Sequence, residues 1–92
     1  MSKLTPKIRF TLENINKIPN QAGVYILWRG ANGKPYIGSA GAWRLKSRLL
    51  EHLRRKDKRG ITSFQYKLTG STDEAREWEK YYRDKLNPGQ RI

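Results

Sequence analysis

The chain has 92 residues, the size of one small domain with a single hydrophobic core. It contains no cysteine and only one histidine, which excludes a disulfide framework, a thiolate zinc site and most histidine-based metal cages. Twenty Lys and Arg against eight Asp and Glu give a net charge of +12, which favours a polyanionic partner. This charge supports nucleic-acid binding, but it does not separate DNA from RNA or indicate catalysis.

The N-terminus is mixed and polar. It lacks the apolar core of a signal peptide, and no stretch of the chain approaches the ~20 apolar residues of a membrane span. We therefore expect a cytoplasmic protein with one domain over residues 1–92, in which residues 1–20 form an extension that packs onto the rest. A short strand and a turn are expected there, anchored by apolar side chains: Ile8, Phe10, Leu12, Ile15 and Ile18.

A β-hairpin is predicted in the first half of the chain. Residues 24–28 are rich in β-branched and aromatic side chains, which is typical of a strand. Asn32-Gly33 is a strong hairpin signal, because a type I′ turn needs positive φ at both central positions. Residues 35–38 then form the returning strand.

The hairpin register decides which side chains share a face. With a two-residue loop, Arg29 would pair with Tyr36 and Leu27 with Gly38. Because side chains alternate along a strand, Tyr25 and Tyr36 would then lie on one face of the sheet. A longer loop would shift this register.

The second half of the chain predicts a helix, a strand and another helix. A leucine at every fourth position marks the first helix, over residues 42–56: Leu45, Leu49 and Leu53. Residues 62–68 alternate polar and apolar side chains, as in a strand with one buried face. Ser71 with Glu74 resembles a capping box, and residues 87–89 (Asn-Pro-Gly) end the second helix.

One acid of the second helix differs from the others. On a helical wheel of about 100° per residue, Glu79 lies beside Ala75 and Leu86, towards the core, whereas the remaining acids face solvent. A carboxylate placed there needs a cation or hydrogen bonds. A nearby Lys or Arg is the ordinary partner, and a divalent cation is the alternative, since Mg²⁺ is often held by one or two carboxylates with waters and phosphate.

Arg48 and His52 are four residues apart on the first helix and share one face. They border its leucine stripe. Arg48 suits bidentate contact with a phosphate, and His52 could bind a phosphate oxygen or move a proton. Taken singly, Arg48 is better explained as a solvated helix charge and His52 as a residue at the core boundary.

Basic residues are concentrated between Arg44 and Arg59. This stretch has eight Lys or Arg against two acids and therefore predicts a surface that follows a nucleic-acid backbone, with a solubilising face as the alternative. Six residues are candidates for nucleic-acid contact, including one from the predicted hairpin: Lys34, Arg44, Lys46, Arg54, Arg55 and Lys56.

Several of these features together resemble the GIY-YIG nucleases. Gly23-Val24-Tyr25 and Tyr36-Ile37-Gly38 resemble the two-part signature of that family, and the likeness continues through Tyr36–Ala40 to phage-type homing endonucleases. Arg48 and His52 match its Arg with a His or Tyr four residues later. The segment from Glu74 through Glu79 to Pro88 matches the helix with the family's metal-binding Glu. The resemblance covers roughly residues 18–88.

The resemblance implies an α/β fold of the α+β type, a three-stranded antiparallel sheet flanked by helices in the order β-β-α-β-α. It also implies an endonuclease that hydrolyses DNA with one Mg²⁺ (or Mn²⁺) and no small-molecule cofactor. Glu79 would be the metal ligand, and Arg48 would neutralise charge on the phosphate. Tyr25 would contact the attacking water, Tyr36 would shape the site, and His52 would position phosphate or nucleophile.

Two positions depart from the family pattern. Ser39 stands where several members have a Lys, so either Lys46 or Lys34 substitutes for it or the group is not needed. An Asn that others carry shortly after the position of Pro88 is absent, or replaced by Asn87. Members of this family usually gain sequence specificity from an attached module, which we do not expect in so short a chain. We expect weakly selective cleavage or nicking, with branched or damaged DNA among the candidate substrates and specificity supplied by a partner protein. The alternative is a non-catalytic basic module that binds DNA or RNA.

Overall fold

The computed structural model describes residues 3–30, 34–55 and 60–86, apart from the side chain of Arg55. The elements follow in the order β1 (Ile8–Arg9), α1 (Leu12–Asn16), β2 (Gly23–Trp28), β3 (Tyr36–Ala40), α2 (Leu45–Arg55), β4 (Ser63–Leu68) and α3 (Thr72–Leu86). The strands form one antiparallel sheet in the order β1-β4-β2-β3. The predicted α+β class is confirmed, with a fourth strand and a third helix added at the N-terminus.

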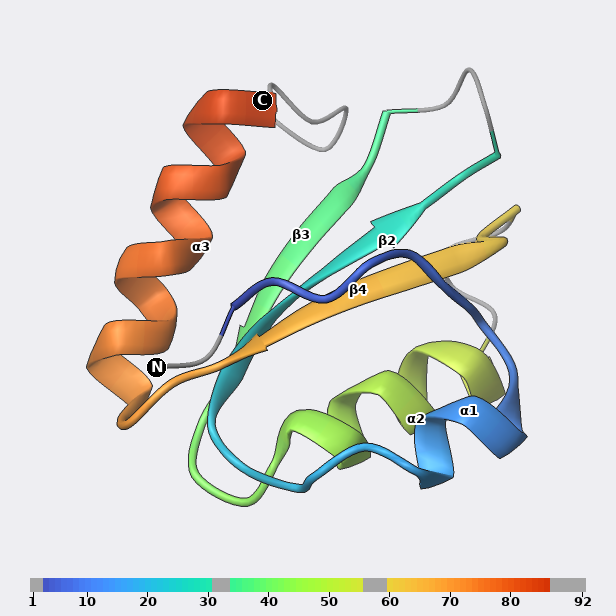
Figure 1. Cartoon of the computed structure of the whole chain (residues 1–92), viewed down its shortest axis with the longest axis horizontal. Helices are drawn as coiled ribbons and strands as arrows, with labels where there is room; N and C mark the ends of the chain where they lie inside the picture. Colours follow the sequence, from blue (N-terminus) through green and yellow to red (C-terminus); the bar gives the residue numbers. More distant parts are fainter. Residues whose placement is uncertain (1–2, 31–33, 56–59, 87–92) are drawn as a thin grey trace.

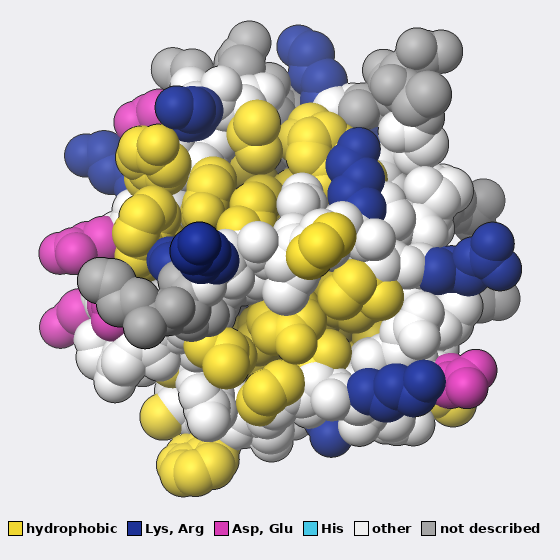
Figure 2. Space-filling view, viewed as in Figure 1, with side chains coloured by type: hydrophobic (Ala, Val, Ile, Leu, Met, Phe, Trp, Pro, Cys, Tyr) yellow, Lys and Arg dark blue, Asp and Glu magenta, His cyan; other side chains and the backbone are white. Residues whose placement is uncertain are grey.

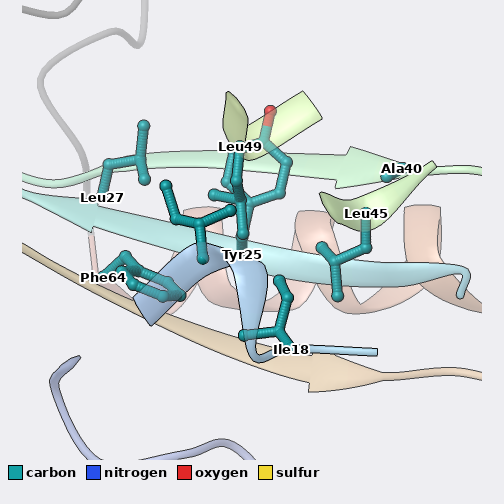
Figure 3. Packing of buried hydrophobic residues seen from close by; sticks show 8 residues of the cluster. Ile18, Tyr25, Leu27, Ala40, Leu45, Leu49 and Phe64 are labelled. Atoms are coloured by element: carbon teal, nitrogen blue, oxygen red, sulfur yellow. The ribbon is translucent and has the colours of Figure 1, made fainter. Parts of the chain in front are cut away.

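Helices cover both faces of the sheet (Figure 1). One face packs against α1 and α2 around buried Tyr25, Leu45, Leu49 and Phe64, and Figure 3 shows these side chains converging between the ribbons. The other face packs against α3 around Val24, Ile26 and Ile37. No helix within the described ranges is long and apolar enough to cross a membrane.

The predicted hairpin forms, but its register differs. Leu27 pairs with Tyr36 and Tyr25 with Gly38, so the predicted pairing of Arg29 with Tyr36 is wrong by two residues. The reason is that the ladder ends at Leu27 and Tyr36, which makes the connection longer than a two-residue turn. A shift of two residues preserves the alternation of side chains, so both tyrosines still lie on the α2 face. The predicted Asn32-Gly33 turn lies outside the described residues.

The N-terminal extension adds one strand and one helix. Arg9 and Ile8 pair with β4, and Thr11 caps α1 by accepting a hydrogen bond from the backbone N–H of Asn14 (3.2 Å). Ile15 and Ile18 are buried as predicted. Leu12 is 56% exposed, so its prediction as an anchor is wrong: at the first position of α1 it faces away from the sheet.

The start of α3 follows the predicted capping pattern with one difference. The Ser71 hydroxyl accepts from the backbone N–H of Glu74 (3.1 Å). The Glu74 carboxylate accepts from the N–H of Gly70 (2.8 Å), one residue before the cap, and so the box closes one position earlier than expected. The helix then directs Trp78, Tyr82 and Leu86 onto the sheet, on the side where the wheel placed Leu86.

Candidate active site

A buried tyrosine–histidine pair is the centre of the candidate site. Tyr25 on β2 has no exposed surface, and its hydroxyl lies 2.8 Å from Nε2 of His52, which is 9% exposed on α2. Tyr36 of β3 packs against the same imidazole with ring centroids 5.5 Å apart. Three of the predicted site residues, separated by up to 27 positions in sequence, therefore form one aromatic cluster.

Gly38 makes room for this pair. A Cβ atom added at Gly38 would lie 2.5 Å from both the Cζ atom and the hydroxyl of Tyr25, which is closer than side-chain atoms approach. Gly38 stands directly opposite Tyr25 in the ladder, so the phenol lies across the bare backbone of β3. Gly23 is also constrained, since its added Cβ would lie 2.7 Å from the carbonyl oxygen of Lys67 on β4. Both glycines of the two-part signature therefore have a steric reason in this fold.

The Tyr25 phenol keeps its proton. Burial raises its pKa well above the ordinary value, and the neighbouring Tyr36 raises it further, while the Arg48 guanidinium lowers it by less. Arg48 offers only hydrogen-bond donors and cannot accept the phenol hydrogen, whereas Nε2 of His52 donates or accepts according to the imidazole tautomer. In the tautomer that carries its hydrogen on Nδ1, Nε2 of His52 accepts from the Tyr25 hydroxyl.

Removing this hydroxyl should have a measurable effect on stability. We expect Tyr25→Phe to lower the free energy of unfolding by about 1–3 kcal/mol at neutral pH, because a buried hydrogen bond is lost. Above pH ~10 the unfolded wild type releases the phenol proton while the folded state retains it, so wild-type stability should fall by about 1.4 kcal/mol per pH unit.

The pH dependence of the stability difference between the wild type and Tyr25→Phe separates a titrating buried phenol from a ring that only packs. Since Tyr25→Phe lacks the titrating group, its stability deficit should shrink as the pH rises from 10 towards the folded pKa of Tyr25. Urea unfolding of both proteins at neutral pH and above pH 10 measures the difference. A deficit that stays constant with pH would show that the phenol does not titrate as the burial requires.

Arg48 lies beside the cluster on the preceding turn of α2. Its side chain is 39% exposed and forms a loose ion pair with Glu51 (3.9 Å). Tyr25 and Tyr36 are both close enough to influence its pKa. A partly exposed guanidinium next to a buried His–Tyr pair is suited to meet a phosphate from solvent.

Glu79 approaches from the other side of the sheet. Ser39 of β3 points to the α3 face and donates a hydrogen bond to Glu79 (2.6 Å), whose side chain is 20% exposed. Arg83, one turn later on α3, donates to the second carboxylate oxygen. The charge of Glu79 contributes to the raised pKa of Tyr25. The carboxylate therefore lies at edge strand β3, electrostatically coupled to the phenol, and both of its oxygens have protein partners.

A single metal ion could bind the Glu79 carboxylate only if Arg83 moved away from it. No group of three or more His, Cys, Asp or Glu side chains gathers in residues 3–30, 34–54 and 60–86, so a metal cage is not built there. One carboxylate with waters and phosphate is nevertheless a usual Mg²⁺ environment. Arg83 would have to leave Glu79 for the ion to bind. The Nε atom of Arg83 is buried and has no hydrogen-bond partner among the described residues, which is a costly arrangement that displacement of Arg83 would relieve. The residues present therefore fit one ion once Arg83 is displaced.

The predicted nucleic-acid contacts have different surroundings. Lys34, Arg44 and Arg54 are exposed. Lys46 donates from Nζ to the carbonyl oxygen of Asn16 (3.0 Å), so it ties α2 to the end of α1. Lys56 and the side chain of Arg55 lie outside the described part. Figure 2 shows apolar side chains across much of one face, with Lys and Arg side chains both among them and at the rim.

Sequence reasoning did not name the two partners of Glu79. Arg83 could have been found from its spacing, since oppositely charged residues four apart on a helix are neighbours. Ser39 could not, because its contact joins β3 to α3 across 40 residues. The need for glycine at position 38 could not be predicted, because it depends on the observed pairing of Gly38 with Tyr25, which puts the Tyr25 ring where a Cβ atom would lie.

Comparison with known proteins gives no relative: no protein-family model, curated protein or solved structure matches the chain. A function is therefore inferred from the chemistry of the site.

Proposed function

We propose that this chain is a divalent-metal-dependent endonuclease of the GIY-YIG type, which hydrolyses DNA phosphodiester bonds with one metal ion. The observation that carries the proposal is the hydrogen bond between Tyr25 and His52, with Tyr36 and Arg48 beside it. Core packing explains the burial of Tyr25, and the hydrogen bond to His52 and the nearby Arg48 cation add polar chemistry to that core. As a phosphate site they combine a cation, an imidazole and two phenols on one sheet face.

Each side chain has a distinct role in this proposal. Arg48 binds the scissile phosphate and neutralises the charge that builds on it. His52 and Tyr36 line the place of the attacking water. Tyr25 has no exposed surface and holds His52 through a hydrogen bond, so it is a positioning residue. Water attacks phosphorus and the bond to the 3′ oxygen breaks; the attacking water gives one proton to bulk solvent, and the departing 3′ oxygen takes one up from solvent.

Glu79 is the proposed ligand for Mg²⁺ or Mn²⁺. When bound there, the ion would polarise the phosphate and stabilise the leaving oxygen. Ser39 keeps Glu79 oriented, and Arg83 holds the carboxylate when no ion is present. Arg83 would then move to solvent or to a phosphate of the DNA.

The second candidate is a basic module that binds DNA or RNA without cutting it. The pairing of Glu79 with both Ser39 and Arg83 favours this alternative, because it leaves no carboxylate oxygen without a partner. The net charge of +12 suits both functions. Binding that weakens steeply with salt, with no cleavage in any metal, would support it.

Cleavage of supercoiled plasmid tests the proposal. We expect nicked product with Mg²⁺ or Mn²⁺ and none in EDTA. Arg48→Ala should reduce the rate by about 10²–10³-fold, the usual cost of removing one group that stabilises transition-state charge. Arg76→Ala is the matched control, because Arg76 is an exposed arginine of α3 away from the cluster. Equal losses in both variants would mean that only bulk charge matters.

A further inference from the structure

Trp43 stands out among the aromatic residues described. It is 74% exposed, the largest exposed fraction of any large apolar side chain in the described ranges. Its backbone has φ 63°, a region that bulky residues rarely adopt. The turn that holds it is closed by the N–H of Arg44, which donates to the carbonyl oxygen of Gly41 (3.1 Å). An exposed indole on a strained turn has no packing role that explains it.

An open pocket lies beside this indole. It has a volume of about 280 Å³, more than the ~150 Å³ cavity that holds a benzene ring. Trp43 lines it together with residues from the ends of three elements: Gln21, Ala22, Ala42, Thr69 and Gly70. Thr69 directs its hydroxyl inward to the carbonyl oxygen of Ser71 (2.9 Å), while the Gln21 amide is exposed with donors and an acceptor. A planar ring with polar edges suits such a pocket.

The surrounding charge selects the kind of ligand. Arg44 follows Trp43 directly and is exposed, and Arg48 lies one turn further along α2, about 6 Å along the helix axis at 1.5 Å per residue. A polyanion lying along α2 would therefore place phosphates at these arginines and a base at Trp43. In an intact duplex the bases are stacked inside and cannot reach an indole.

We propose that Trp43 and its pocket bind an unpaired nucleobase by stacking, so that the preferred ligand is single-stranded nucleic acid or a strand with an unpaired base. This inference deepens the proposed function, on which it rests for the nucleic-acid partner. It assigns a substrate class, since a stacked base at Trp43 would bring the adjoining strand to Arg48.

The backbone suggests a variant that keeps the fold. Trp43→Gly removes the indole and relieves the strained φ, because glycine adopts positive φ readily. We expect it to unfold at the same temperature as the wild type or higher. Trp43→Phe keeps a smaller stacking surface, and Tyr81→Ala is a control for loss of another exposed aromatic, 47% exposed on α3.

Binding in EDTA separates stacking from cleavage. With a fluorescently labelled single-stranded oligonucleotide, Trp43→Gly should weaken binding by about 5- to 150-fold, the range for loss of one stacked base. Trp43→Phe should retain most of the affinity, and Tyr81→Ala all of it. A blunt duplex of the same sequence should bind the wild type and Trp43→Gly equally.

Two results would overturn the inference: single-strand binding by Trp43→Gly at wild-type affinity, or equal weakening on the duplex. Neither depends on metal or turnover. If Glu79 and Arg48 prove unnecessary for cleavage while Trp43→Gly still loses single-strand binding, the nuclease proposal fails and the stacking site stands. If cleavage depends on both residues and Trp43→Gly binds normally, the stacking site alone fails.

Discussion

Replacing Glu79 by alanine should lower metal-dependent plasmid cleavage by at least about 10³-fold, because it removes the only protein ligand proposed for the ion. Glu79→Gln should be equally inactive, although it preserves the size of the side chain and an acceptor for Ser39. Binding of DNA in EDTA should be maintained or slightly stronger, since one negative charge is lost.

The matched control is Glu77→Ala, which removes an exposed carboxylate two residues away on the solvent face of α3. It should cut plasmid at the wild-type rate. Cleavage by Glu79→Ala at a rate equal to that of Glu77→Ala would remove Glu79 from the mechanism and leave its bonds to Ser39 and Arg83 as purely structural.

Gly38→Ala should be the most destabilising single substitution at the site. The added methyl group would meet the Tyr25 ring 2.5 Å away, and the ring is fully buried, with its hydroxyl bonded to His52. Overpacking of this kind costs about 2–3 kcal/mol, and the melting temperature should fall by roughly 10–20 °C for a domain of this size. Activity should be lost as well, because Tyr25 cannot stay in place.

A second substitution tests this explanation. Tyr25→Leu removes the ring that the methyl group meets, so Gly38→Ala should cost less in that background than in the wild type. Gly70→Ala is the control, since its added Cβ meets only the end of the Glu74 side chain at 3.3 Å. Additive effects of the Gly38 and Tyr25 substitutions would show that the two residues do not compete for space.

Local periodicity was enough to predict most of the fold. The leucine stripe placed α2, and the wheel placed Leu86 and Glu79 towards the sheet. Tyr25 and Tyr36 were correctly predicted on one face although the predicted register was wrong, because a shift by an even number of residues leaves each side chain on the same face.

The helix that was missed, and the exact place of the short strand expected in residues 1–20, depend on contacts between distant segments. α1 has five residues, too few to show periodicity, and it is defined by the Thr11 cap and the burial of Ile15. β1 has two residues and is defined by its antiparallel pairing with the edge of β4. The partners of Glu79 come from β3 and from the next turn of α3, and only the first needs the tertiary fold.

Anomalous scattering from a crystal soaked in Mn²⁺ tests most directly whether Glu79 and the Tyr25–His52–Arg48 cluster form one site. We expect a single manganese peak on the Glu79 carboxylate at the edge of β3, with Arg83 moved away from it. An unchanged bond between Glu79 and Arg83 with no manganese peak, at an ion concentration that supports wild-type cleavage, would contradict the proposed metal site.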